Sequence, residues 1–330
     1  MSSKLLEVKN LKTSFFTPEG EVKAVSGVSY YVDQKEIIAI VGESGCGKSV
    51  TQMSVMQLIQ TPPGKILEGE VFFEGEDLLK YHSKSKQMLS VRGSGISMIF
   101  QEPMTSLNPV LTVGYQLTEM IMTHKKVNKE EANKQALQLL NDVGIPEAKR
   151  RLKEYPFQMS GGMRQRVMIA LAISCNPKLI IADEPTTALD VTTQAQIMEK
   201  LMSLVRERNT ALIIITHNLG LVARYAERIY VMYGGRIIES GTAEDILKNP
   251  VHPYTNGLLA SVPKLDQSRS QELIPIPGAP PKLINLPDSC NFMPRCKFAC
   301  EKCKKSKAPE LHCIDGKMHF VACHVKGVDN

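Results

Sequence analysis

One glycine-rich stretch constrains the fold of this chain more than any other. Residues 36–59 read EIIAIVGESGCGKSVTQMSVMQLI: an apolar run, a turn with three glycines, and a helical pattern. Glycines in such a turn let main-chain N–H groups point inward and surround phosphate oxygens without interference from side chains. Because a strand precedes the turn and a helix follows it, the stretch predicts a phosphate-binding loop (P-loop) in an α/β protein.

The positions of this loop have distinct expected tasks. Lys48 supplies positive charge to the terminal phosphates, and Ser49 offers a hydroxyl to Mg²⁺. The helix that begins there directs the positive end of its dipole at the anion. Cys46 occupies a variable position of the motif, and we assign its thiol no chemistry. The residues expected to contact the phosphates are Gly42, Glu43, Ser44, Gly45, Cys46, Gly47, Lys48, Ser49 and Val50.

A second apolar stretch ends in paired acids. Residues 178–185 read KLIIADEP, which suits a buried strand that delivers carboxylates at its C-terminal edge, where open α/β sheets hold ligands. We expect Asp183 to hold Mg²⁺ and Glu184 to polarise the attacking water, because phosphoryl transfer depends mainly on positioning and charge neutralisation. Taken alone, the two acids could equally cap the following turn.

A third motif lies between those two, in residues 155–178, YPFQMSGGMRQRVMIALAISCNPK. Ser160, Gly161 and Gly162 stand where a helix is expected to begin. The free N–H groups and the dipole at a helix start favour a phosphate, so this is a second anion site. One P-loop already binds one nucleotide, so the residues alone leave open what this second site holds.

These motifs resemble the ATP-binding-cassette (ABC) ATPases, and the resemblance covers Leu5 to about Leu259. In that family the signature helix of one subunit closes over the γ-phosphate held by the P-loop of another, so two chains enclose two ATPs. SGGMRQR is similar to the family signature, with Met159 and Met163 in place of its Leu and Gln. The resemblance implies an ATPase that uses ATP and Mg²⁺ and has a second ATPase subunit as partner.

The same resemblance assigns further residues. Gln101, after the strand GISMIF, resembles the Q-loop glutamine that senses Mg²⁺ and the attacking water. His217, at the end of ALIIITH, resembles the switch histidine that contacts the γ-phosphate, and Ala188 to Asp190 resembles the D-loop of the dimer interface. Phe15 resembles the aromatic that stacks on adenine, with Phe16 as the other candidate. Packing in the core is the alternative for these rings.

A helical region is expected between the P-loop and the signature helix. Residues 129–144, KEEANKQALQLLNDVG, carry an apolar stripe that ends at a glycine. Together with this helical pattern, the resemblance implies an α/β fold: a P-loop cassette ATPase with a RecA-like core, an antiparallel β subdomain, an inserted helical subdomain at about 102–176, and a small cysteine-rich C-terminal appendage. We expect a nucleotide-binding domain at 1–262 and a C-terminal extension at 263–330.

Three stretches narrow the resemblance to the ATPases of oligopeptide and dipeptide importers, a group that includes nickel-importing relatives. They are residues 101–114, 249–263 and 275–296. In these relatives, the region of Met104 to Pro109 receives a coupling helix from the membrane subunit. The resemblance implies a partner ATPase of different sequence, two transmembrane permease subunits, an extracytoplasmic peptide-binding protein acting indirectly, and a peripheral place on the cytoplasmic face of the cell membrane.

Neither the charge nor the hydropathy of the sequence indicates a partner beyond those named above. The start MSSKLLEVKNL has no apolar segment typical of a secretory signal, and the longest apolar runs are too short to span a bilayer. The net charge is +6, and residues 282–330 carry nine Lys and Arg against five Asp and Glu. Without aromatic interleaving, this excess indicates a solvated face, and we expect no nucleic-acid partner.

The C-terminal region gathers thiols. An ATP site indicates a reducing compartment, where clustered cysteines bind metal more often than they form disulfides. The importer resemblance implies Cys290, Cys296, Cys303 and Cys323 as ligands of a 4Fe-4S cluster, with zinc as the alternative occupant. Cys300 and Cys313 fall outside that pattern. We expect the bound centre to stabilise a lobe too small for its own core, and free structural cysteines are the alternative.

Two other classes of protein remain as alternatives. One is a soluble cassette ATPase acting on nucleic acid or ribosomes, although such proteins commonly carry two cassettes or a long coiled coil. The other is an iron–sulfur redox or sensor protein in which ATP turnover is secondary.

Overall fold

The computed structural model describes residues 4–102, 106–186, 189–261, 275–314, 316 and 318–326. The chain divides into two compact units. The helical unit comprises residues 1–5, 33–36 and 80–214. The P-loop unit comprises residues 6–32, 37–79 and 215–330. The domain boundary expected at residue 262 falls at the start of 262–274, outside the described residues.

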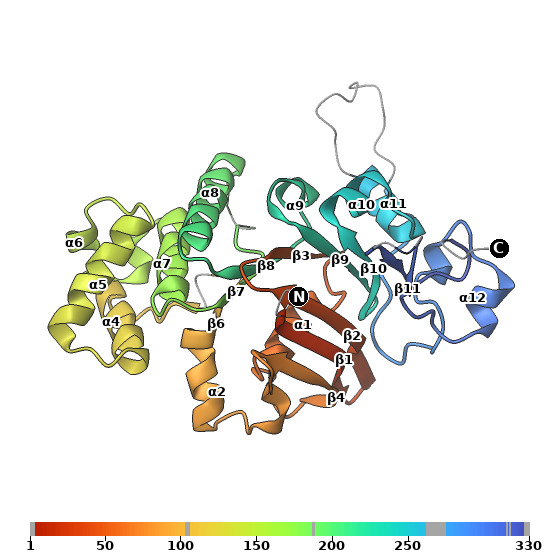
Figure 1. The fold of residues 1–330 in the computed structure, drawn as a ribbon, viewed down its shortest axis with the longest axis horizontal. Helices are drawn as coiled ribbons and strands as arrows, with labels where there is room; N and C mark the ends of the chain where they lie inside the picture. Colours follow the sequence, from red (N-terminus) through yellow and green to blue (C-terminus); the bar gives the residue numbers. More distant parts are fainter. Residues whose placement is uncertain are drawn as a thin grey trace. The chain divides into compact units, whose positions relative to one another are not determined.

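An antiparallel sheet, in the strand order β2-β1-β4-β5, forms one part of the P-loop unit (Figure 1). Its strands are β1 (Lys4–Thr17), β2 (Gly20–Asp33), β4 (Gly64–Phe73) and β5 (Glu76–Asp77). Leu6, Val8 and Leu11 of β1 are buried and alternate with more exposed residues along much of the strand, as expected when one face of a sheet covers a core. The predicted antiparallel β subdomain is confirmed.

A second sheet carries the phosphate-binding loop. In the P-loop unit its strands run in the order β11-β12-β10-β9-β3. Their bounds are β3 (Ile37–Val41), β9 (Arg228–Tyr233), β10 (Arg236–Thr242), β11 (His312–Cys313) and β12 (Phe320–Val321). All five residues of β3, IIAIV, are buried, and β3 pairs parallel to β9. A continuous apolar run is typical of a strand covered on both faces.

The unit also contains several helices. They are α1 (Lys48–Val55), α9 (Leu219–Tyr225), α10 (Ala243–Lys248), α11 (Pro253–Ala260) and α12 (Glu301–Lys305), with the 3-10 turn η4 (Met293–Arg295). No helix among the described residues of the chain combines the length and the hydropathy that a bilayer crossing requires.

The C-terminal extension shares a sheet and a core with the rest of its unit. β12 pairs antiparallel with β10, so Val321 lies opposite Glu239. Upstream, the N–H of Lys23 donates to the carbonyl of Leu283 over 2.8 Å, and Val22 forms an antiparallel bridge with Ile284, so this part of the extension lies along β2. Phe292 is only 4% exposed and packs in a buried cluster with Tyr233 and Tyr254. The extension is thus part of the structure that supports the P-loop.

The helical unit contains the predicted inserted helices. Its elements are η1 (Leu78–Lys80), which straddles the unit boundary, α2 (Lys86–Ser90), η2 (Val91–Gly95), β6 (Ile96–Ile99), α4 (Val113–His124), α5 (Lys129–Asp142), α6 (Ala148–Arg151), η3 (Pro156–Gln158), α7 (Gly161–Ile173), β7 (Leu179–Asp183) and α8 (Val191–Glu207). β8 (Ala211–Thr216) follows α8. β6 and β7 pair in parallel. The apolar stripe of α5 is buried, and Gly144 follows the helix at φ 73°, as its sequence predicts.

A buried polar cluster is centred on Glu239 of β10. The Glu239 carboxylate is fully buried and accepts the N–H of Val251 over 2.7 Å and that of His252 over 3.0 Å. His319 Nε2 lies 2.8 Å from the same carboxylate. His252 Nδ1 accepts the N–H of Tyr254 and so caps α11. Burial lowers the pKa of His252 to about 4, although the charge of Glu239 acts in the opposite direction.

We expect this histidine to make stability depend on pH. The unfolded chain binds a proton near pH 6.5 that the native His252 does not accept until about pH 4. Stability is therefore lost as pH falls through that window, by about 2 kcal/mol at pH 5. His252→Asn keeps a capping side chain but does not titrate. Urea unfolding at pH 7 and pH 5 should show a smaller loss for the variant, and equal losses would contradict the assignment.

Candidate nucleotide-binding site

The phosphate-binding loop is packed closely against its own unit. It leaves β3 at Val41 and enters α1 at Lys48. Gly47 caps α1 in the left-handed conformation, at φ 102°, and a Cβ there would lie 2.1 Å from the carbonyl oxygen of Ala24. A Cβ on Gly42 would lie 2.2 Å from the carbonyl oxygen of Met232. Both positions require glycine because any side chain would displace main chain of β2 or β9.

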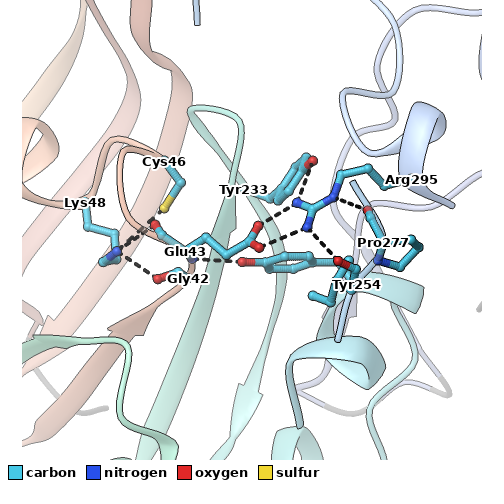
Figure 2. A network of polar contacts seen from close by, with 9 residues as sticks. Gly42, Glu43, Cys46, Lys48, Tyr233, Tyr254, Pro277 and Arg295 are labelled. Atoms are coloured by element: carbon cyan, nitrogen blue, oxygen red, sulfur yellow. Dashed lines mark hydrogen bonds and ion pairs between the residues drawn. The ribbon is translucent and has the colours of Figure 1, made fainter. Parts of the chain in front are cut away.

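Lys48 places a buried positive charge inside the loop. Its side chain donates from Nζ to the carbonyl oxygens of Gly42 and Glu43, over 2.8 Å and 2.9 Å (Figure 2). The residue is 5% exposed, and no carboxylate in the described part of the chain contacts its ammonium group. An ammonium held by neutral acceptors alone is costly to bury, so the loop fits an anionic phosphate that would neutralise it.

The opposite side of the loop is held by residues that sequence reasoning did not identify. Arg295 donates from its two terminal nitrogens to both carboxylate oxygens of Glu43, over 2.7 Å and 3.0 Å (Figure 2). The hydroxyl of Tyr254 accepts the N–H of Glu43 over 2.9 Å. The hydrogen bonds to Glu43 raise the pKa of Arg295 above its usual value. No local pattern signals this pair, because its members lie 252 positions apart.

The predicted acid pair belongs to the helical unit. Asp183 ends β7 and is 5% exposed. Glu184 follows it with φ 44°, a left-handed conformation that is uncommon for a residue other than glycine and that is enriched at functional sites. Gln101 donates from Nε2 to the carboxylate of Glu184 over 3.0 Å. The structure thus brings together the two side chains that were both expected to position the attacking water.

The Ser-Gly-Gly motif begins a helix, as predicted. The hydroxyl of Ser160 caps α7 by accepting the N–H of Met163 over 3.3 Å. A Cβ on Gly161 would lie 3.3 Å from the side chain of Leu189, and one on Gly162 would lie 3.1 Å from that of Thr193. The two glycines therefore let the start of α7 approach the start of α8 closely.

Parts of two predicted motifs lie outside the described residues. These are Ala188 of the predicted D-loop, and Met104 with Thr105 of the predicted coupling region. The last D-loop residue, Asp190, caps α8 by accepting the N–H of Thr193 over 2.9 Å. Such main-chain hydrogen bonds lower the pKa of Asp190.

The remaining predicted contacts belong to the P-loop unit. Ser49 and Val50 are half-buried in the first turn of α1, whereas Ser44 and Gly45 are exposed. His217 follows β8 and is exposed.

The two candidate aromatic residues differ in exposure. The ring of Phe15 is half-buried, and a Cβ added to Gly64 would approach it to 2.9 Å. Phe16 is 52% exposed. Stacking of Phe15 on adenine stays a prediction, with Phe16 as the more exposed alternative.

The C-terminal cysteines are free thiols that gather in one region. The sulfurs of Cys300 and Cys303 lie 3.7 Å apart. Burial raises the pKa of Cys290 to about 11, and the charges of Cys303 and Cys323 contribute to that rise. Burial and the charge of Cys323 also raise the pKa of Cys296. These sulfur donors suit iron or zinc, but across the residues that the structure describes no three His, Cys, Asp or Glu side chains converge on a metal position.

Two sequence families match the chain. The ABC transporter family matches residues 25–187. The family described as "Oligopeptide/dipeptide transporter, C-terminal region" matches residues 238–303, which include most of β10, all of α11 and most of the clustered cysteines.

Individual relatives agree with both matches. The oligopeptide transport ATP-binding protein OppD of Bacillus subtilis is 53% identical over 297 residues, which cover 90% of this chain and 82% of the relative. The dipeptide transport ATP-binding protein DppD of the same organism is 52% identical, covering 89% and 87%. A dimeric post-hydrolysis structure of the ATP-binding cassette MJ0796 bound to ADP and Pi has a TM-score of 0.64 and 28% identity, covering 72% of this chain and 98% of that chain.

The P-loop, its sheet and the helical insertion define the class as an ABC ATPase. Because the high identity extends through the C-terminal region, the chain belongs to the oligopeptide/dipeptide transporter branch of that family.

We expect Lys48→Ala to weaken nucleotide binding, because the variant lacks the buried charge that is expected to neutralise the phosphates. Charge-assisted hydrogen bonds of this kind correspond to a loss of about ten- to hundredfold in affinity. Titration with a fluorescent ATP analogue measures the dissociation constant. Lys149→Ala, which removes an exposed lysine of the helical unit, serves as the control. Unchanged affinity in Lys48→Ala would rule out the P-loop assignment.

We expect Glu184→Gln to keep nucleotide affinity but to lower ATP turnover by about a hundred- to ten-thousandfold. The amide still reaches Gln101 but no longer polarises water as a carboxylate does. Phosphate release under saturating ATP measures turnover. The control is Glu207→Gln, at the exposed end of α8. Turnover equal to that of the unaltered protein would remove Glu184 from its role.

Proposed function

We propose that this chain is the ATP-hydrolysing subunit of a peptide importer, and that it works at an interface with a second ATPase subunit. The observation that carries the proposal is similarity across both the cassette and the C-terminal region to proteins named as oligopeptide and dipeptide transport ATP-binding proteins. A cassette acting on nucleic acid would have no reason to share that C-terminal region.

In this proposal the described residues bind and orient the reactants. The loop from Gly42 to Val50 surrounds the phosphates, and Lys48 neutralises part of their charge. Ser49, Gln101 and Asp183 would hold Mg²⁺, which supplies further neutralisation of phosphate charge when bound. The contact between Gln101 and Glu184 supports a shared role in aligning the attacking water.

Other residues recognise the ends of the nucleotide. Phe15 stacks on adenine, and His217 contacts the γ-phosphate. Ser160, Gly161 and Gly162 face a nucleotide held by the partner subunit. The start of α7 at Gly161 supports this role, because the first N–H groups of a helix have no partner within the helix and favour an anion. The dimeric form of the similar cassette MJ0796 supports an arrangement of paired subunits.

The proposed assembly has several components. The partner ATPase is a chain of different sequence, and two transmembrane permease subunits carry the peptide. An extracytoplasmic peptide-binding protein delivers cargo to those permeases. This chain then lies peripherally on the cytoplasmic face of the cell membrane.

Reconstitution tests this function. The chain is purified together with its bound subunits and placed in liposomes with ATP inside. Uptake of labelled oligopeptide or dipeptide should require ATP and should be lost with Glu184→Gln, while Glu207→Gln should transport normally. Nickel is the competing cargo in the same assay. Full ATP turnover by the isolated chain, with no uptake in the assembly, would contradict the proposal.

We also infer that Cys290, Cys296, Cys303 and Cys323 bind a 4Fe-4S cluster that stabilises the C-terminal region. The thiol donor set and the mutual electrostatic influence of these sulfurs support the inference. Because burial raises the pKa of Cys290, Cys296 and Cys303, metal binding must displace their protons. No step of ATP hydrolysis depends on this centre.

Metal analysis distinguishes the possible occupants. We expect anaerobically purified protein to be coloured and to contain about four iron atoms per chain. Cys290→Ser should lose the iron and melt at a lower temperature. Cys313→Ser, at an exposed cysteine outside the proposed set, should retain it. Zinc in place of iron, or iron retained by Cys290→Ser, would contradict the inference.

A further inference from the structure

An ion pair joins the cysteine-rich end of the chain to the phosphate-binding loop. Arg295 stands directly before Cys296, at the end of η4. Its guanidinium makes a two-pronged contact with the carboxylate of Glu43, over 2.7 Å and 3.0 Å, and its side chain is only 6% exposed. Two-pronged contacts of this kind restrict geometry as well as adding attraction.

The remaining hydrogen-bonding groups of Arg295 are also used. Nε donates to the carbonyl of Pro277 over 2.8 Å, and Nη2 donates to that of Ile276 over 3.4 Å (Figure 2). Nη1 donates to the hydroxyl of Tyr233 over 3.3 Å. Together with the two bonds to Glu43, these contacts match the five N–H donors of a guanidinium. The side chain is thus fixed in position from several directions.

The same region supports the loop by a second route. Phe292, three positions before Arg295, packs edge-on against Tyr233 at 5.2 Å and against Tyr254 at 5.5 Å between ring centroids. The hydroxyl of Tyr254 in turn accepts the N–H of Glu43. Cys290 and Cys296 pack against this aromatic cluster. The positions of the side chain and of the main chain of Glu43 therefore depend on how the C-terminal extension packs against its unit.

The negative charge of Glu43 affects how the loop binds an anion. Its main-chain carbonyl contacts Lys48, so the residue lies within the phosphate-binding loop itself. A half-buried carboxylate there repels an incoming polyphosphate unless it is neutralised. Arg295 supplies the neutralising charge, and removing one partner of such a pair leaves the other charge uncompensated.

We propose that Arg295 is a positioning residue for nucleotide binding: by neutralising the carboxylate of Glu43, the cysteine-rich extension sets the affinity of the phosphate-binding loop. The inference rests on the proposed function, because it concerns the same nucleotide site. In this proposal the extension regulates the nucleotide site. By thermodynamic linkage, a bound nucleotide strengthens the packing of the extension by the same factor by which the extension strengthens nucleotide binding.

A double substitution separates this role from simple structural support. The probe is a fluorescent, non-hydrolysable ATP analogue with Mg²⁺, titrated into the full-length chain. Arg295→Gln should weaken binding about tenfold, within the usual range for coupled sites. Adding Glu43→Gln to that variant removes the uncompensated charge and should restore affinity to within about threefold of the unaltered protein.

The chain offers a matched control. Arg236 of β10 pairs with Asp288 of the extension over 3.4 Å, so this ion pair also links the extension to the sheet. The hydrogen bond of this pair joins Arg236 to Asp288 and does not involve the phosphate-binding loop. Arg236→Gln should therefore leave the affinity for the analogue unchanged.

The outcomes decide the inference one way or the other. It is overturned if Arg295→Gln binds as tightly as the control, or if the double variant stays as weak as Arg295→Gln alone. If Arg295→Gln does not fold, as judged by circular dichroism, Glu43→Gln alone decides. Binding tighter than that of the unaltered protein supports the inference, because Arg295 then faces the phosphates without its counter-charge, and equal or weaker binding overturns it.

Failure of the proposed function has a different signature. In that case the unaltered protein would not bind the analogue, or Lys48→Ala would bind it equally well. Normal dependence on Lys48 with no dependence on Arg295 would overturn the present inference alone.

Discussion

The buried ammonium of Lys48 is the constraint on which the rest of the site depends. Its hydrogen-bond acceptors are carbonyl oxygens of the loop itself. The loop can direct these carbonyls at the ammonium only because it turns sharply at two glycines, which pack against neighbouring main chain. An all-apolar strand behind the loop and a helix in front of it hold that turn in place. Phosphate binding is therefore a property of the whole P-loop unit and not of the loop alone.

The C-terminal extension illustrates how a segment without a large core of its own becomes ordered. It contributes strands to the existing sheet and places Phe292 in a cluster with two tyrosines. Burial of an aromatic ring is among the larger single contributions to packing in a protein. The extension therefore has attachments that are independent of any metal, and a bound centre would add to them.

Sequence reasoning identified the parts whose signals are local. The strand and helix around the P-loop, the capping role of Ser160 and the apolar stripe of α5 follow from spacing and residue type within a few turns of chain. The pairing of Arg295 with Glu43 could not be predicted, because an isolated arginine between cysteines does not indicate its partner. Nor could spacing alone choose between Phe15 and Phe16, since neighbouring residues of a strand point to opposite faces.

The way the second sheet ends in the P-loop unit bears on how the molecule avoids self-association. Among the residues that the structure describes, the sheet continues beyond β10 through β12 and β11, each two residues long. A long exposed strand would present a row of unsatisfied amides and carbonyls to any passing chain. Two strands of two residues each leave few such groups exposed. The C-terminal extension therefore protects an edge of the sheet to which another chain could otherwise add a β-strand.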